Sequence, residues 1–152
     1  MKLVVQRVKR ASVTVVDQDK VVGKIGNGLF ILVGVGKNDS ASDARQLALK
    51  LSKLRIMSDD NAKMNLTVRD LGAEILVVSQ FTLYSDTSGG NRPSFVGAAK
   101  PDVARLVYEE FVRGLADLGN KVATGSFGDY MKISLELDGP VTIVLDSSQT
   151  TK

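Results

Sequence analysis

The 152-residue sequence contains no histidine, no cysteine and no tryptophan. The missing histidine excludes Ser-His-Asp and Cys-His nucleophilic machinery and histidine-ligated zinc. The missing cysteine excludes thiolate redox chemistry and any disulfide framework. Any catalysis by this chain must therefore use hydroxyls, amides, carboxylates, lysines, backbone groups or the substrate itself.

The sequence also lacks a large excess of charge of either sign. It has 20 lysines and arginines and 17 aspartates and glutamates, which gives a net charge of +3. Such a balance is compatible with a polyanionic partner, but it is equally typical of an ordinary solvated surface. The longest apolar run, residues 29–33, is far too short to span a bilayer, and the first residues lack the apolar stretch of a signal peptide. We therefore expect a cytoplasmic protein without a membrane segment.

Strand signals dominate the first third of the chain. Residues 3–16 are rich in valine and threonine, and apolar and polar residues alternate at 12–15 as in a half-buried strand. After a polar turn, residues 21–25 predict a short strand, and the apolar, β-branched run at 29–35 predicts a buried one. Further strands are predicted at 74–81, 121–123, 131–137 and 141–145.

Two segments have the apolar spacing of amphipathic helices. The first follows capping residues at 39–42 and continues to Leu54, and the second begins at Pro101 and is stopped by Gly119. The order of strands and helices is not a regular β-α-β alternation, which argues against a doubly wound sheet. We predict an α/β protein of the α+β kind: a mixed, largely antiparallel sheet with a barrel-like core and two helices packed on it.

The chain is close to the usual size of one domain and long enough to bury a core without metal or disulfide support. No internal repeat or low-complexity linker divides it. We therefore predict a single domain over residues 1–146, followed by a polar tail over residues 147–152 that we expect to be disordered.

Carboxylates give no sign of a metal or acid–base site. Residues 59–61, Asp-Asp-Asn, share only their composition with a calcium loop, because the spacing and the terminal glutamate are missing. They predict a turn instead. No pair of carboxylates has the context of glycosidase-type acid–base chemistry, and we predict neither a metal nor a cofactor.

Polar side chains gather where the predicted strand at 74–81 runs into a loop. Ser79 and Thr82 offer hydroxyls, and Gln80 between them offers both a donor and an acceptor beside Phe81. A strand end can present such groups and its backbone N–H groups to a ligand without burying them unpaired. From spacing alone, the alternative of a simple polar strand terminus stays open.

Residues 138–142, Asp-Gly-Pro-Val-Thr, lie between two predicted strands. Asp-Gly in this context is typical of a hairpin turn, although Pro140 lacks the N–H that a strand ladder needs. A cis bond between Gly139 and Pro140 would instead hold two successive carbonyl groups in a fixed orientation. The residues leave two alternatives open. One is a turn with an edge-strand proline, and the other is a functional loop.

Together these segments resemble the D-aminoacyl-tRNA deacylases (D-Tyr-tRNA deacylases) over essentially the whole chain. The pair Ser-Gln-Phe-Thr at 79–82 and Gly-Pro-Val-Thr at 139–142 is the most specific part of the resemblance. The other matching motifs are Val-Gln-Arg-Val at 5–8, Ala-Ser-Val at 11–13, Gly-Asn-Gly-Leu at 26–29, Leu-Arg-Ile at 54–56, Lys-Met-Asn at 63–65 and Arg-Pro-Ser-Phe at 92–95.

The resemblance implies a homodimeric hydrolase that cleaves the ester between a D-amino acid, or glycine, and the 3′-terminal adenosine of tRNA. It assigns Ser79, Gln80, Phe81 and Thr82 to the catalytic pocket. It also implies that a cis Gly139–Pro140 pair from the other subunit faces the bound amino acid, and that Arg7 supports this pair. The family usually has asparagine where this chain has Leu137, which questions any polar role at that position.

This family assignment is consistent with the lack of histidine. An aminoacyl ester is already labile and has a vicinal 2′-hydroxyl, so hydrolysis needs positioned water and a stabilised oxyanion more than a protein base. We hypothesise that backbone N–H groups near Phe81 and Thr82 hold the oxyanion, while Ser79 and Gln80 orient the substrate. No residue supplies an obvious base, so Thr82 is interpreted as a positioned hydroxyl and not as a nucleophile.

Two alternatives belong to different functional classes. One is an editing domain like those of some threonyl-tRNA synthetases, which would remove a small L-amino acid. The other is a non-enzymatic RNA-binding module, which the low aromatic content of 5% and the lack of a stacking platform disfavour.

Overall fold

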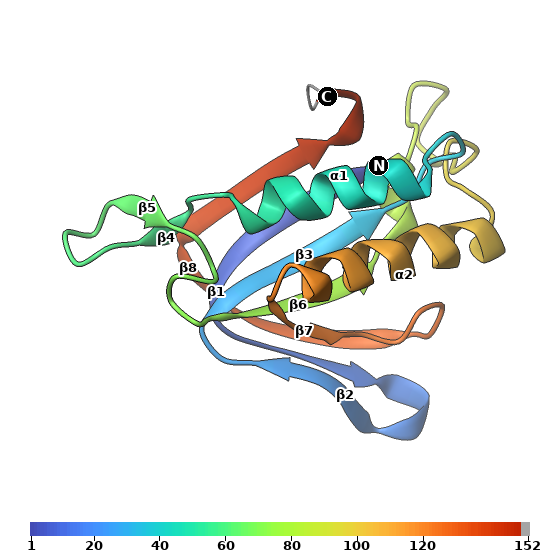
Figure 1. The fold of residues 1–152 in the computed structure, drawn as a ribbon. Coiled ribbons are helices and arrows are strands. Elements are labelled where there is room, and N and C mark those ends of the chain that lie inside the picture. The colour runs from blue at the N-terminus through green and yellow to red at the C-terminus, as the bar shows by residue number, and fades with distance from the viewer. Residues whose placement is uncertain (150–152) are drawn as a thin grey trace.

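The computed structural model describes residues 1–149, in which two helices lie on one face of a strongly curved β-sheet (Figure 1). No described helix combines the length and apolarity that crossing a bilayer would require. In chain order the elements are β1 (Lys2–Val15), η1 (Val16–Gln18), β2 (Lys20–Ile25), β3 (Gly28–Gly34), α1 (Ala41–Ser52), β4 (Met57–Ser58), β5 (Met64–Leu66), β6 (Glu74–Ser79), η2 (Phe81–Tyr84), α2 (Pro101–Asp117), β7 (Lys121–Thr124), β8 (Met131–Asp146) and η3 (Ser147–Gln149).

The main sheet is mixed, as the sequence predicts. Its strand order is β2-β1-β3-β6-β7, with β3–β6 and β6–β7 parallel and the β1 pairings antiparallel. One edge of β1 is shared by β3 and β2, and β8 pairs along the other edge. The sheet curls until β2 approaches β7: a Cβ on Gly23 would lie 2.4 Å from the Thr124 carbonyl oxygen.

Two apolar clusters stabilise this arrangement. The larger lies between the sheet and the helices and includes Phe111 and Leu47, and the smaller lies inside the curl of the sheet around Phe30 and Leu76. All four of these side chains are at most 2% exposed. The predicted mixed sheet with a barrel-like core and two covering helices is therefore confirmed.

The helix ends follow the signals in the sequence. Ser40 and Asp43 form a reciprocal capping box at the start of α1. Pro101 occupies the first turn of α2, and Gly119 follows the helix with φ +84°, a value that favours glycine. Helix α1 ends at Ser52, so Leu54 lies just beyond it.

Two strand predictions need correction. The strand expected over 74–81 ends at Ser79, because the backbone turns at Gln80 into the short helix η2. The hairpin turn considered at Asp138-Gly139 is wrong, because the segments on either side of it continue as one strand, β8, along β1. Between them β8 contains three more residues than the β1 segment it spans, so residues 138–141 form a bulge.

The C-terminal tail begins with an ordered turn. Ser147–Gln149 form η3, and Ser147 Oγ accepts a hydrogen bond of 2.6 Å from the Met1 amino group. The structure therefore places in a helical turn three residues for which the sequence predicts disorder. The rest of the predicted tail, residues 150–152, lies outside the described residues.

Candidate active site

The end of β6 opens into a cavity of about 700 Å³. The apolar residues 75–78 of β6 are buried between β3 and β7. Just beyond the strand, the Gln80 N–H donates a 2.7 Å hydrogen bond to the Val33 carbonyl, and η2 then begins. A cavity of this size is within the usual range for small-molecule sites. It is lined by Val35, Val78, Ser79, Gln80, Phe81, Phe95, Ala98, Ala99, Pro101, Ala104, Phe127, Gly128, Asp129, Tyr130, Met131 and Ile133.

Aromatic side chains are concentrated around this cavity. Four of the eight aromatic residues of the chain line it, namely Phe81, Phe95, Phe127 and Tyr130. The Phe81 and Phe95 rings meet edge to face with centroids 5.0 Å apart, and Phe81 is 55% exposed. Four rings from three separate segments line one cavity, an arrangement that no local sequence run reveals.

Of the four residues predicted at the strand end, three line the cavity and the fourth lies beside them. Ser79, Gln80 and Phe81 contribute to the wall, and Gln80 Nε2 donates a hydrogen bond to the Thr82 hydroxyl. Thr82 itself is exposed. The first N–H groups of η2, from Phe81 and Thr82, precede its first helical hydrogen bond, as at any helix start.

A carboxylate that the sequence did not single out for the site connects the end of η2 to the segment that follows β3. Asp39 Oδ2 accepts hydrogen bonds from the Tyr84 hydroxyl at 2.9 Å and from the Gly36 N–H at 2.5 Å. Gly36 in turn pairs with the cavity residue Ala98. Burial, and then the hydrogen bond to Asp39, raise the pKa of Tyr84 above its usual value. Local spacing gave no signal for this long-range contact.

The second predicted group lies on the β8 bulge. The Gly139–Pro140 peptide is cis, and both residues are exposed. The Arg7 guanidinium binds the preceding residue: its Nε lies 3.1 Å from Asp138 Oδ2 and donates to the Asp138 carbonyl at 3.3 Å. Arg7 is 9% exposed and also donates to the Ile56 carbonyl at 3.0 Å.

The two predicted groups are separated within one chain. Ser79 pairs with Val33, which pairs with Leu3 on β1, whereas the bulge faces the part of β1 around Arg7. Four residues of extended strand correspond to roughly 13 Å, and β3 and β1 lie between β6 and β8. Among the residues that the structure describes, the cavity lining includes neither Gly139 nor Pro140.

Across residues 1–149, no group of three or more acidic side chains is arranged to hold a metal ion. At residues 59–61, where the sequence predicts a turn, the Asp59 carboxylate accepts hydrogen bonds from the backbone N–H groups of Asn61 and Lys63, both at 2.9 Å. Hydrogen bonds from Asn65 and from these N–H groups lower the pKa of Asp59. This carboxylate therefore stabilises the β4–β5 turn.

Known proteins similar to this chain share its whole length. It is 52% identical over 149 residues to "D-aminoacyl-tRNA deacylase" of Thermosipho africanus (strain TCF52B), covering 98% of this chain and 99% of the relative. It is 54% identical over 146 residues to the protein of the same name from Deinococcus radiodurans, covering 96% and 99%.

Two solved structures share the fold. The "c-Myc DNA Unwinding Element Binding Protein" superposes with a TM-score of 0.89 at 38% identity, covering 96% of this chain and 98% of that one. A "probable eukaryotic D-amino acid tRNA deacylase" superposes at 0.82 with 17% identity, covering 95% and 97%. Residues 4–146 match the family described as "D-Tyr-tRNA(Tyr) deacylase", and with these relatives this shows that the chain belongs to that deacylase family.

Proposed function

We propose that this protein hydrolyses the ester bond of D-aminoacyl-tRNA, and of mischarged glycyl-tRNA, to release free tRNA and the amino acid, in the cytoplasm where translation uses these substrates. The observation that carries the proposal is the cavity at the end of β6, where Ser79, Gln80 and Phe81 meet an aromatic wall. Aromatic faces bind nucleobases by stacking, and hydroxyl and amide groups can orient an ester. Family membership supports the same reaction.

In this proposal the chemistry depends on positioning and not on an enzyme base. The N–H groups at the start of η2 stabilise the oxyanion that forms when water attacks the ester carbonyl. Gln80 and Ser79 orient the adenosine, whose vicinal hydroxyl stays available to the reacting centre. Thr82 accepts a hydrogen bond from Gln80, a donor that cannot remove its proton, which supports a positioning role.

The proposal further requires a homodimer in which Gly139 and Pro140 of one subunit complete the cavity of the other. Both residues are exposed, and they stand on a bulge distant from their own chain's cavity. Strand β8 lies at the sheet edge beside β1 and carries exposed apolar side chains, with Leu137 46% and Val144 66% exposed. An exposed apolar edge strand is suited to pairing with another chain.

A main-chain wall at Gly139 and Pro140 would reject L-amino acids whatever their side chain, because the clash involves the Cβ substituent itself. A pocket that measured side-chain size could discriminate only about 10–200-fold. Glycine lacks a side chain, so its ester is expected to be cleaved. The wild-type protein should therefore deacylate D-Tyr-tRNA and Gly-tRNA and leave L-Tyr-tRNA intact.

The shared site can be tested by mixing two inactive variants, Gln80→Ala in the strand end and Gly139→Ala in the bulge. A randomly mixed dimer population should recover about a quarter of the wild-type rate, because half of the dimers then hold one intact composite site. No recovery after subunit exchange, verified by mass, would contradict a site built from two subunits. Each variant alone, at the same total concentration, is the control.

The same substrates separate the two alternatives. An editing domain for a small L-amino acid would deacylate L-Ser-tRNA and ignore D-Tyr-tRNA. An RNA-binding module would bind tRNA and hydrolyse neither ester.

A further inference from the structure

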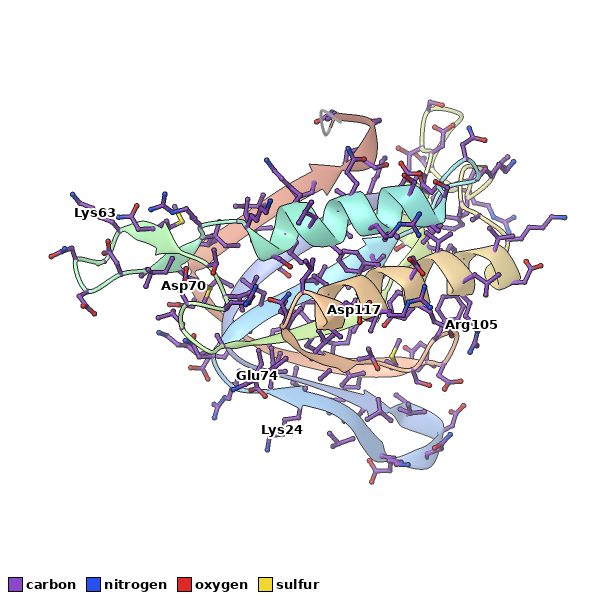
Figure 2. All side chains as sticks on the ribbon, viewed as in Figure 1. Lys24, Lys63, Asp70, Glu74, Arg105 and Asp117 are labelled. Atoms are coloured by element: carbon purple, nitrogen blue, oxygen red, sulfur yellow. The ribbon has the colours of Figure 1, made fainter. Side chains whose placement is uncertain are left out.

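Arg105 on α2 reaches across to the cavity wall. Its guanidinium lies over the Phe127 ring, 4.8 Å from the centroid, and its Nη2 donates to the Phe127 carbonyl at 3.4 Å. Figure 2 shows Arg105 on the side of α2 that faces the loop between β7 and β8. Since Phe127 lines the cavity, this cation–π contact holds the guanidinium beside the site.

This guanidinium has no acidic partner among the residues that the structure describes. The arginines that form ion pairs there are Arg7, Arg10, Arg45 and Arg113. Arg105 is exposed, and within residues 1–149 its one hydrogen bond is to a neutral carbonyl at the long limit for such contacts. Most of its five N–H donors therefore remain available to a ligand.

In the described part of the chain, the lining of the cavity has no cationic side chain to pair with a phosphate. Within residues 1–149 its lining contains no lysine or arginine, and its one charged side chain is Asp129, which accepts a hydrogen bond from Ser126 Oγ. If the ester and the terminal adenosine occupy the cavity, the phosphodiester that links them to the rest of the tRNA must leave through its mouth. An exposed guanidinium held against the cavity residue Phe127 has the chemistry to bind it.

We propose that Arg105 binds the phosphate joining the 3′-terminal adenosine to the preceding nucleotide, and that Phe127 holds the guanidinium plane in place. This inference rests on the proposed function. Arg105 contributes to substrate binding and takes no part in bond cleavage, so its loss should act on KM and leave kcat unchanged.

The experiment compares two substrates, D-Tyr-tRNA and the 3′-D-tyrosyl ester of adenosine, which has no phosphate. Arg105→Ala should raise KM for the tRNA about tenfold and leave kcat/KM for the adenosine ester unchanged. The salt dependence of log(kcat/KM) for the tRNA should become shallower by about 0.7, as for one lost contact to single-stranded nucleic acid. Arg105→Lys keeps the charge and should keep the wild-type salt dependence.

Arg113→Ala is the matched control, because Arg113 is exposed on the same helix but pairs with Glu110, away from the cavity. It should behave as wild type on both substrates. An unchanged KM for the tRNA in Arg105→Ala would overturn the inference, as would an equal loss on the adenosine ester, which would indicate a change in cavity shape. A wild-type protein that cleaves neither substrate would instead overturn the proposed function, and this inference with it.

Discussion

The Arg7 guanidinium binds both the side chain and the backbone of Asp138: its Nε lies 3.1 Å from the Asp138 Oδ2 and 3.3 Å from the Asp138 carbonyl oxygen. The same guanidinium donates to the Ile56 carbonyl just before β4 and to the Ser58 hydroxyl within β4. One buried cation thus joins three segments that are far apart in the chain and holds the bulge that carries Gly139 and Pro140. Arg7 therefore anchors the exposed bulge from its buried side.

We expect Arg7→Ala to lower deacylation of D-Tyr-tRNA about 10²-fold, since a small displacement of a positioning loop has an effect of this size. It should also lower the free energy of unfolding by about 1–3 kcal/mol, because buried acceptors lose their donor. Lys9→Ala is the control: Lys9 lies 3.4 Å from the same carboxylate, but its side chain is 58% exposed. If both variants lost activity equally, the charge near Asp138 would matter and not the buried contact.

Gly139→Ala should inactivate the enzyme without unfolding it. Gly139 has φ +128°, and a Cβ there would lie 2.9 Å from Val141 Cγ2 and 3.0 Å from the Val141 nitrogen. The bulge must therefore change shape to accept alanine. Thermal unfolding and deacylation measured together test this expectation.

Gly26→Ala provides the comparison for Gly139→Ala, because the nearest contact of a Cβ at Gly26 is an ordinary 3.7 Å to Glu74 Oε2. Full activity of the Gly139→Ala protein would show that the bulge does not need glycine.

Thr82→Ala should retain nearly full kcat. The hydroxyl accepts a hydrogen bond from Gln80 and is exposed, an environment that does not activate a nucleophile. Removing a true nucleophile costs about 10⁴-fold or more. Single-turnover rates on D-Tyr-tRNA decide between these outcomes, and trapping of an acyl-enzyme in the wild type but not in the variant would reverse our interpretation.

Stability should fall in alkaline solution partly through Tyr84. Burial and the bond to Asp39 raise its pKa in the folded state, whereas an unfolded tyrosine ionises near its usual value of 10.0. The stability due to this proton is therefore fully present below about pH 10 and is lost as the pH rises beyond it.

Tyr84→Phe should accordingly lose less of its free energy of unfolding than wild type between about pH 9 and pH 11. Denaturant unfolding at several pH values measures the difference, and parallel curves for the two proteins would contradict it. Tyr108→Phe offers a second case, because burial also raises the pKa of Tyr108, whose hydroxyl donates to the Val77 carbonyl.

Elements whose signals are local were predicted well from the sequence. The capping residues before α1, Pro101 at the start of α2 and Gly119 after it act within a few residues, so the sequence alone indicates the helix boundaries. The predicted end of the strand at residue 81 lies two residues beyond the observed end at Ser79. The turn at Gln80 depends on packing against β3 and the cavity, which local sequence does not show.

The residues alone determined which chemistry was available, because a chain without histidine or cysteine cannot use their side chains as bases, nucleophiles or ligands. They also indicated both helices, most of the strands, and the motifs at residues 79–82 and 139–142. The tertiary structure decided how these parts meet: β8 continues along β1 on both sides of the bulge at Gly139 and Pro140, four aromatic rings line one cavity, and Arg7 binds the base of the bulge. These relationships join residues up to about 130 positions apart, and side-chain periodicity carries no information on which strands become neighbours.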